Sequence, residues 1–233
     1  MSHNLKASTF LGSDTSKPAV RQIFGISGSG KTTWMNELIR RSQTSPSFSE
    51  HQRIIVFDVK HEGYEQSGMV VSDWKGFQKS VKRNRVTVIH PPRLETAQLF
   101  LDAVIDYLFE VSRRVQDFGA SLIIEESSTF IRSTPNGVPM SIKRMATQGR
   151  SFGLSLILLN QRALNSKWTD TQTTSMVVFR LPTPDLDLVN RRWGFDMRDI
   201  DARLRTEKFS FAHFDLETLD IDYYHPVDIQ PTP

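Results

Sequence analysis

The chain has 233 residues, of which 38% are hydrophobic and 24% charged, and its net charge is +3; this is the composition of one globular domain, and the charge is too small to indicate a nucleic-acid binder by itself. The absence of cysteine excludes a disulfide scaffold, a thiolate metal site and a cysteine nucleophile. No apolar run approaches the roughly 20 residues that span a bilayer, and the polar N-terminus lacks the apolar stretch of a signal peptide, so we expect a soluble intracellular protein.

Both ends of the chain are predicted to be arms outside the folded domain. Residues 1–18 are rich in Ser and Thr without a sustained period, and Lys17-Pro18 ends this segment, which is typical of a flexible or loosely docked arm. Residues 228–233 form a tail whose prolines cannot join a central strand. We therefore expect a single domain over residues 19–227.

Apolar runs of strand length recur along this domain, separated by helical segments. The first covers residues 20–24. The later runs are Ile54–Phe57, Val86–Ile89, Leu122–Ile124, Leu154–Leu159 and Met176–Phe179. Because these runs are short and β-branched or aliphatic, they are expected to be buried on both faces of a largely parallel sheet.

Two segments have apolar residues at helical spacing. They are residues 31–41 and residues 97–115, and Gly119 after the second suits a helix C-cap. Strands that alternate with helices predict an α/β fold with a mostly parallel, doubly wound sheet. Residues 209–224 alternate in polarity instead, which favours an antiparallel edge hairpin near the C-terminus.

The segment Gly25–Thr32 reads Gly-Ile-Ser-Gly-Ser-Gly-Lys-Thr and lies between the first predicted strand and the first predicted helix. A phosphate-binding loop (P-loop, Walker A) requires this order, because glycines let backbone amides approach phosphate oxygens and the following helix points its N-terminus at them. Lys31 is expected to reach the β- and γ-phosphates, Thr32 to ligate Mg²⁺, and Thr33 to lie nearer the α-phosphate. The predicted ATP-binding residues are Gly25, Ile26, Ser27, Gly28, Ser29, Gly30, Lys31, Thr32 and Thr33.

Polar residues at two strand ends are expected to complete the site. The run Leu122–Ile124 ends in Glu125 and Glu126, and in an open parallel sheet ligands bind beyond the carboxyl ends of the strands. Adjacent strand residues point to opposite sides, so we predict that Glu125 holds Mg²⁺ through water and that Glu126 deprotonates the water that attacks the γ-phosphate. Gln161, preferred here to Asn160, is expected to sense the γ-phosphate or to position that water.

Arg150 lies in the segment Gln148–Gly153, just before a long apolar run. An arginine at this place is a candidate to complete the site of a neighbouring subunit and to stabilise charge on the transferring phosphoryl group. Surface arginines are usually only solvated, so both interpretations stay open from these residues alone.

Together these segments resemble the HerA/FtsK superfamily of ring-forming, DNA-pumping ATPases. Val56–Tyr64 is similar to its second-strand Asp-x-Lys-x-Glu-Tyr segment, with one residue inserted before the tyrosine. The strand that ends in Glu125-Glu126 is similar to its Walker B element. Gly149–Arg162 is similar to its Gly-Arg-x-x-Gly-strand-Gln-Arg signature, which is the most specific stretch, and the resemblance covers residues 20–181.

The resemblance implies a minimal ATPase core, most like the genome-packaging ATPases of icosahedral viruses with an internal membrane. Such an enzyme forms a homo-oligomeric ring, here expected to be a pentamer or hexamer, and drives double-stranded DNA into a capsid. The implied partners are double-stranded DNA and capsid or membrane proteins at the packaging vertex, and the implied location is the host cytoplasm or the virion. The resemblance makes Arg150 the leading trans-acting arginine, with Arg144, Arg162 and Arg180 as competitors.

A DNA pump needs basic groups that face its channel and bind phosphates of any sequence. Three basic segments are candidates, at residues 132–144, 162–168 and 75–85. We expect at least one of them to line the channel, although each taken singly is more typical of a solvated surface.

Three rival functions stay open. The first is a helicase or conjugation-type translocase of the same superfamily, and the second is a morphogenesis or extrusion ATPase that acts on protein partners. The third is a nucleotide or nucleoside kinase, which is disfavoured because Glu126 beside the metal ligand suits the activation of water.

Overall fold

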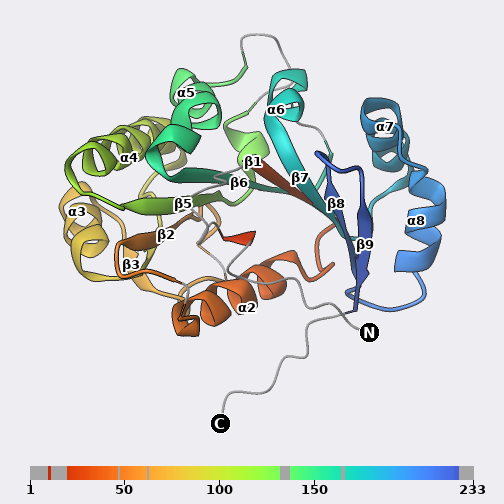
Figure 1. Ribbon diagram of the computed structural model, residues 1–233, viewed down its shortest axis with the longest axis horizontal. Coiled ribbons are helices and arrows are strands. Elements are labelled where there is room, and N and C mark those ends of the chain that lie inside the picture. Colours follow the sequence, from red (N-terminus) through yellow and green to blue (C-terminus); the bar gives the residue numbers. More distant parts are fainter. Residues whose placement is uncertain are drawn as a thin grey trace.

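The computed structural model describes residues 10–11, 20–46, 48–61, 63–131, 137–163 and 166–225. They form one nine-stranded sheet in the order β3-β4-β2-β5-β6-β1-β7-β8-β9, with helices on both of its faces (Figure 1). The strands from β3 to β7 are parallel to their neighbours, and β8 and β9 continue the sheet in antiparallel fashion. The fold class predicted from the sequence is therefore confirmed.

The strands are β1 (Val20–Phe24), β2 (Gln52–Phe57), β3 (Met69–Val71), β4 (Val86–Ile89), β5 (Gly119–Ile124), β6 (Leu154–Asn160), β7 (Thr173–Val178), β8 (Phe211–Asp215) and β9 (Ile221–Tyr224). The α-helices are α2 (Lys31–Thr44), α3 (Trp74–Arg83), α4 (Leu94–Arg114), α5 (Met140–Gln148), α6 (Lys167–Gln172), α7 (Thr183–Trp193) and α8 (Met197–Leu204). Two short 3₁₀ turns are η1 (Ser127–Thr129) and η2 (Gly149–Phe152).

Every predicted strand is present, as are both predicted helices and the edge hairpin. The assignment of Gly119 as a helix C-cap is wrong, because α4 ends at Arg114 and Gly119 is the first residue of β5. The short strand β3 and the helices α3, α5, α6, α7 and α8 were not foreseen, since none of them carries a long periodic apolar pattern.

The central strands are buried along their whole length because each is covered on both faces. Along β5 and β6, Ile123 and Ile157 pack with α2 on one face, whereas Leu122 and Leu156 pack with α4 on the other. This alternation, with apolar residues at both parities, explains why the strands have uninterrupted apolar runs. In Figure 1, α2 lies below the sheet, and α4 and α5 lie above it.

The two predicted terminal arms fall mainly outside the described residues. Two residues of the N-terminal segment are described, and both are buried. Phe10 packs edge-to-face on Trp34 with ring centroids 5.1 Å apart, and the Leu11 carbonyl accepts a hydrogen bond from the Ser121 hydroxyl. This part of the segment therefore contributes to the core between α2 and the sheet. In the described part of the chain, no helix is both long and apolar enough to cross a membrane.

Parallel pairing gives the sheet two different ends. We call the end reached by Phe24, Phe57, Ile124 and Asn160, the last residues of β1, β2, β5 and β6, the carboxyl end. The opposite end, where the same strands begin, is the amino end. The loop Gly25–Gly30 lies at the carboxyl end, and η2 lies at the amino end because it directly precedes β6.

Candidate nucleotide site

The loop between β1 and α2 has the conformation that its glycines permit. Gly28 and Gly30 adopt left-handed backbone angles, with φ of 72° and 99°, which side chains with a Cβ disfavour. The loop is anchored at the end of β6 and to the segment after β7, since the Gly25 amide donates to the Asn160 carbonyl at 3.2 Å and the Ile26 amide donates to the Arg180 carbonyl at 3.0 Å. The N-terminus of α2 is thereby aimed at the space above the loop.

The Lys31 ammonium group lies inside this loop. It donates to the Gly25 and Ile26 carbonyls at 2.5 and 3.0 Å, and the side chain is buried. Burial lowers the pKa of Lys31, an effect that the nearby carboxylates of Glu125 and Glu126 oppose. An ammonium has three donors, so one remains for a phosphate oxygen.

A cavity of about 200 Å³ opens in front of Lys31. It is lined by Ser27, Gly28, Gly30, Lys31, Thr32, Thr33, Lys60, Glu125, Glu126 and Gln161. The structure therefore brings together the predicted loop residues, both acidic residues and Gln161. Gly25, Ile26 and Ser29 belong to the same loop but do not line the cavity.

The sequence argument that Glu125 and Glu126 point to opposite sides is wrong. β5 ends at Ile124, and Glu126 has φ and ψ of 49°, a left-handed conformation that breaks the alternation of the strand. Both carboxylates consequently line one cavity. A left-handed backbone is costly for a residue with a side chain, and such strain tends to persist where it serves a site.

The segment that follows β2 holds both carboxylates. The Lys60 ammonium donates to Glu126 Oε1 at 2.6 Å, and the buried Tyr64 hydroxyl donates to Glu125 Oε2 at 2.9 Å. Asp58, itself fully buried, shapes the turn by accepting hydrogen bonds from the backbone amides of Lys60 and His61. The contacts of Lys60 and Tyr64 were missed from the sequence. One signal in the sequence points to Lys60 and Tyr64: they belong to a polar segment that directly follows the buried strand β2, at the carboxyl end of the sheet.

The side chains around Tyr64 suit a magnesium ion. Burial and the Glu125 carboxylate raise the pKa of Tyr64 well above its usual value, so its hydroxyl stays a donor. Thr32 lies near enough to influence the pKa of this hydroxyl, and both Thr32 and Glu125 line the phosphate cavity. Two hard oxygen donors beside the phosphate loop match the preference of Mg²⁺ for carboxylate, hydroxyl and phosphate oxygens. Burial raises the pKa of Glu125, and the Tyr64 hydrogen bond opposes that rise.

Asn160 and Gln161 have separate roles. The Asn160 side chain is buried, accepts from the Ser128 amide at 2.7 Å and donates to the Ser127 hydroxyl at 2.8 Å. It therefore fixes the turn that follows Glu126. Gln161 lines the cavity and is the amide that can reach a bound phosphate.

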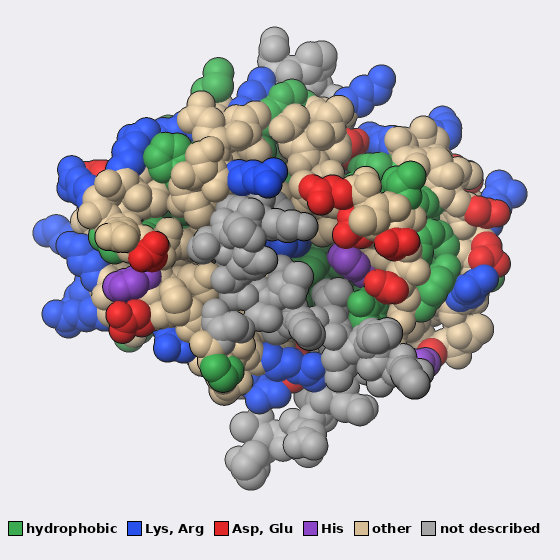
Figure 2. Space-filling view, in the orientation of Figure 1, with side chains coloured by type: hydrophobic (Ala, Val, Ile, Leu, Met, Phe, Trp, Pro, Cys, Tyr) green, Lys and Arg blue, Asp and Glu red, His purple; other side chains and the backbone are tan. Residues whose placement is uncertain are grey.

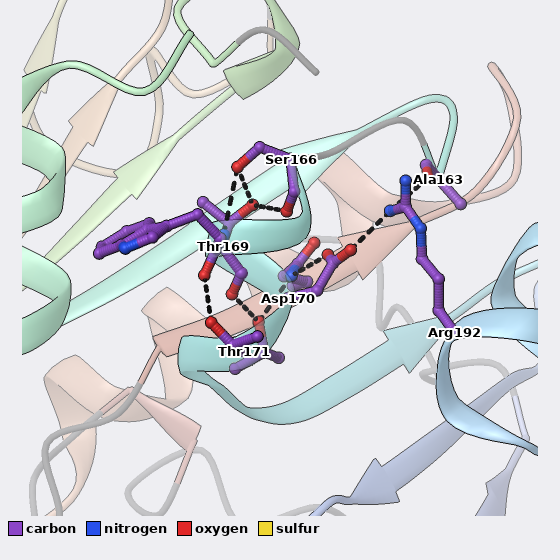
Figure 3. A network of polar contacts seen from close by, with 9 residues as sticks. Ala163, Ser166, Thr169, Asp170, Thr171 and Arg192 are labelled. Atoms are coloured by element: carbon purple, nitrogen blue, oxygen red, sulfur yellow. Dashed lines mark hydrogen bonds and ion pairs between the residues drawn. The ribbon is translucent and has the colours of Figure 1, made fainter. Parts of the chain in front are cut away.

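The segment that follows Gln161 is tied to α6 and α7. Arg162 Nε donates to the buried Asp185 carboxylate at 2.6 Å. Arg192 donates to Asp170 at 2.7 Å and to the Ala163 carbonyl at 3.4 Å, and Figure 3 shows its guanidinium between them. Arg162 is thus engaged within its own subunit, which weakens it as a competitor for a trans-acting role.

Arg150 lies away from the cavity. It is exposed on η2 at the amino end, separated from Gln161 by the seven residues of β6, or about 20 Å of extended chain. Arg144, a competitor, pairs with Asp106 at 2.6 Å and lies over the Phe109 ring at 4.0 Å. The chain therefore assembles every predicted site residue except Arg150 around its own loop.

Comparison with solved structures shows which known proteins share this fold. The genome-packaging NTPase B204 of Sulfolobus turreted icosahedral virus 2, in complex with ATP-gammaS, matches with a TM-score of 0.70 and 17% identity over 90% of this chain and 98% of that chain. VirB4 of Thermoanaerobacter pseudethanolicus matches with a TM-score of 0.68 and 9% identity over 93% of this chain and 91% of that chain.

A third match is the cytoplasmic domain of the Thermomonospora curvata type VII secretion ATPase EccC, with a TM-score of 0.60 and 13% identity over 91% of this chain and 26% of that chain. No family model matches the chain, and no curated protein matches it in sequence. The resemblance drawn from the motifs is therefore confirmed for the fold, which is that of these P-loop NTPases.

Proposed function

We propose that this protein hydrolyses ATP in a homo-oligomeric ring and uses the energy to move double-stranded DNA, as a genome-packaging motor. The observation that carries ATP hydrolysis is the position of Glu126 in the same cavity as Lys31 and Glu125. One carboxylate beside the metal ligands suffices for binding. A second one, facing the same space, supplies the base that a water nucleophile needs.

Each side chain has one task in this proposal. The loop amides and Lys31 bind the phosphates, while Thr32 and Glu125 hold Mg²⁺, which neutralises charge on the phosphate oxygens. Glu126 accepts the proton of the attacking water, and Lys60 holds that carboxylate in place. Gln161 orients the water or senses the γ-phosphate, in line with the hydrolysis geometry of P-loop NTPases.

The position of Arg150 supports a ring. In a heterologous ring the amino end of one subunit can meet the carboxyl end of the next, and a pentamer or hexamer closes such a contact. Arg150 then reaches the neighbour's phosphate cavity, where an arginine stabilises charge developing on the transferring phosphoryl group. Its exposure in a single chain suits this role.

Double-stranded DNA is the proposed cargo, because the B204 match is a packaging NTPase that covers nearly the whole of both chains. Basic surface supports the proposal. Figure 2 shows Lys and Arg side chains gathered at the left margin, over α3. Lys75, Lys79 and Lys82 are exposed on that helix, and none of the described residues forms an ion pair with them.

The other two basic segments are only partly described. Residues 132–136 and 164–165 lie outside the described residues, and the described Arg144 and Arg162 are paired with acids. Lys143, Lys167 and the α3 lysines are the described cations of the three basic segments that remain candidates to bind DNA phosphates. Capsid and membrane proteins at a packaging vertex, in host cytoplasm or virion, are the partners that this function implies.

The test is ATPase activity with and without double-stranded DNA, together with the solution mass. We expect a ring-sized mass and DNA-stimulated hydrolysis that weakens as salt rises. Replacing Lys75, Lys79 and Lys82 by Glu should remove the stimulation by DNA and leave basal hydrolysis intact. Replacing Arg203, which pairs with Asp199, by Glu should change neither rate. Hydrolysis indifferent to DNA would contradict the proposed cargo while leaving the ATPase intact.

A protein-moving ATPase is the second candidate, because the EccC domain, named a secretion ATPase, matches 91% of this chain. It predicts a ring whose ATPase ignores DNA. Replacing the α3 lysines would then leave ATP hydrolysis unchanged whether or not DNA is present, and salt would have little effect on hydrolysis.

A further inference from the structure

The phosphate cavity is too small to hold a whole nucleotide. Its volume of about 200 Å³ lies below the 300–1,000 Å³ of typical ligand pockets. Its polar lining, from Lys31 to Glu126, suits phosphates and metal. If ATP binds as proposed, its base must therefore lie outside the cavity, against the surface that borders the loop.

An aromatic ring occupies that border. A Cβ built on Gly30 would lie 3.2 Å from Phe209 Cδ1 and 3.4 Å from Phe209 Cβ, so the ring rests directly on the last residue before α2. Phe209 belongs to the short connection from α8 to β8. The fold thus carries a C-terminal aromatic side chain to the rim of the phosphate loop.

Phe209 is unusual in both exposure and backbone. Its side chain is 41% exposed, whereas Phe211, two residues on, is 2% exposed and packs on Trp34 with ring centroids 5.1 Å apart. Phe209 also has a φ of 68°, which is a genuine outlier for a bulky residue. Strain of this kind costs free energy, so it persists only where the surrounding structure enforces it. Residues with such strain cluster at active sites and ligand-binding sites.

The connection around Phe209 is well tied. The Ser210 hydroxyl lies 3.0 Å from the Leu204 carbonyl and 2.9 Å from the Glu207 carbonyl and shares its one proton between these acceptors, which fixes the turn. Over the ring, the Lys208 ammonium lies 4.7 Å from the centroid. A base that stacks on this face of the ring would displace the Lys208 ammonium.

We propose that Phe209 is the stacking platform for the purine base of the bound nucleotide. The inference rests on the proposed function and adds the base subsite to it. The ring lies beside Gly30, which lines the cavity, its side chain is partly exposed, and its backbone is held in a strained conformation. Stacking of a base on an aromatic side chain contributes about 1–3 kcal/mol, which corresponds to roughly 5- to 150-fold in affinity.

The experiment measures binding of ATP and of ribose 5-triphosphate, which lacks the base, by calorimetry with Mg²⁺ on the full chain. We expect the wild type to bind ATP at least about 10-fold more tightly. Phe209→Ala should weaken ATP binding by that factor and leave ribose 5-triphosphate binding unchanged, and Phe209→Trp should retain the preference. Leu219→Ala is the matched control, because Leu219 is also exposed and has a φ of 64°.

The outcomes separate the two proposals. If the wild type binds neither ligand, the proposed function fails. If it binds both equally, or if Phe209→Ala leaves ATP binding unchanged, the platform is refuted and the ATPase stands. An equal loss for both ligands would show that the ring supports the phosphate loop through Gly30 and not the base, which also overturns the inference. A folded state shared by all variants is checked by circular dichroism.

Discussion

The two ends of the sheet differ in size of cavity and in chemistry. At the amino end, a groove of about 670 Å³ lies between α3, α4 and the start of β2. Most of its charged groups are engaged, since Arg114 pairs with Glu110 at 2.6 Å and Arg53 donates to the Val81 and Gln52 carbonyls. Lys82, at its edge, has no ion pair with the described residues. At the carboxyl end, a cavity less than a third of that volume gathers two carboxylates and two ammonium groups.

This difference shows that convergence of charge, and not volume, marks the candidate site. The carboxyl end holds buried ionisable groups with shifted pKa values and a strained Glu126, whereas the amino end holds Arg150, exposed on its surface. Perturbed groups that face one cavity are the usual mark of a functional site. Under the proposed function, catalytic groups lie at both ends of the sheet and meet across a subunit contact.

The largest effect is expected at the amino end. Arg150→Ala should lower the ATPase rate by about 10³-fold or more, because an arginine that stabilises the transferring phosphoryl group contributes on that scale. ATP binding should change little. Arg114→Ala, an arginine at the same end paired with Glu110, is the control and should retain activity. Full activity of Arg150→Ala in steady-state assays would remove the amino end from catalysis.

At the carboxyl end, Glu126→Gln should keep ATP binding and lose turnover by about 10²- to 10⁴-fold, the range for a general base. Binding and single-turnover measurements separate the two effects. Glu110→Gln, which removes an exposed acid at the amino end, is the matched control. Appreciable hydrolysis by Glu126→Gln would exclude Glu126 as the base.

A smaller effect is expected for the side chain that holds this base. Lys60→Ala removes the 2.6 Å contact to Glu126, and displacement of a catalytic group by about 1 Å can cost up to about 100-fold in rate. We expect the turnover number to fall by about 10-fold or more and Lys60→Arg to recover most of it. If Lys60→Ala raised KM and left turnover intact, Lys60 would be a substrate-binding residue and not a positioning residue.

The smallest effect concerns stability. Burial raises the pKa of Glu125 above its ordinary value of 4.5, so the folded protein binds more protons than the unfolded chain in the interval above that value. Stability without ATP or metal should therefore fall as pH rises through this interval. Glu125→Gln should lack this loss and melt higher at pH 7, by about 2–4 °C per kcal/mol recovered, in a calorimetric series from pH 4 to pH 8. Identical pH dependence of the two proteins would contradict the cause assigned to the shift.

The sequence predicted the elements that have long apolar runs or a loop motif. The phosphate loop was found because Gly28, Gly30 and Lys31 obey a local backbone requirement, and β5 and β6 were found because both of their faces are buried. Short helices such as α5 escaped prediction because their apolar pattern is brief: in the nine residues of α5, the buried residues are Ile142 and Met145.

Within the site, local rules failed where distant segments meet. The contacts of Lys60 and Tyr64 with the two glutamates join residues more than 60 positions apart, and no spacing rule encodes them. The orientation of Glu126 was predicted wrongly because its left-handed backbone overrides strand alternation. Arg150 was predicted as a trans-acting residue, and this stays a prediction, since its distance from its own cavity excludes only a role in the site of the same subunit.

The division of the site between two subunits is tested most directly by complementation. Lys31→Ala has a defective phosphate loop and an intact Arg150, whereas Arg150→Ala has the reverse, so each alone should be inactive. In rings mixed in equal amounts at random, about a quarter of the sites would combine an intact loop with a neighbour's intact Arg150. We predict that mixing restores ATPase activity to about that fraction of the wild-type rate. No recovery, from two variants shown to assemble into the same rings, would contradict the account.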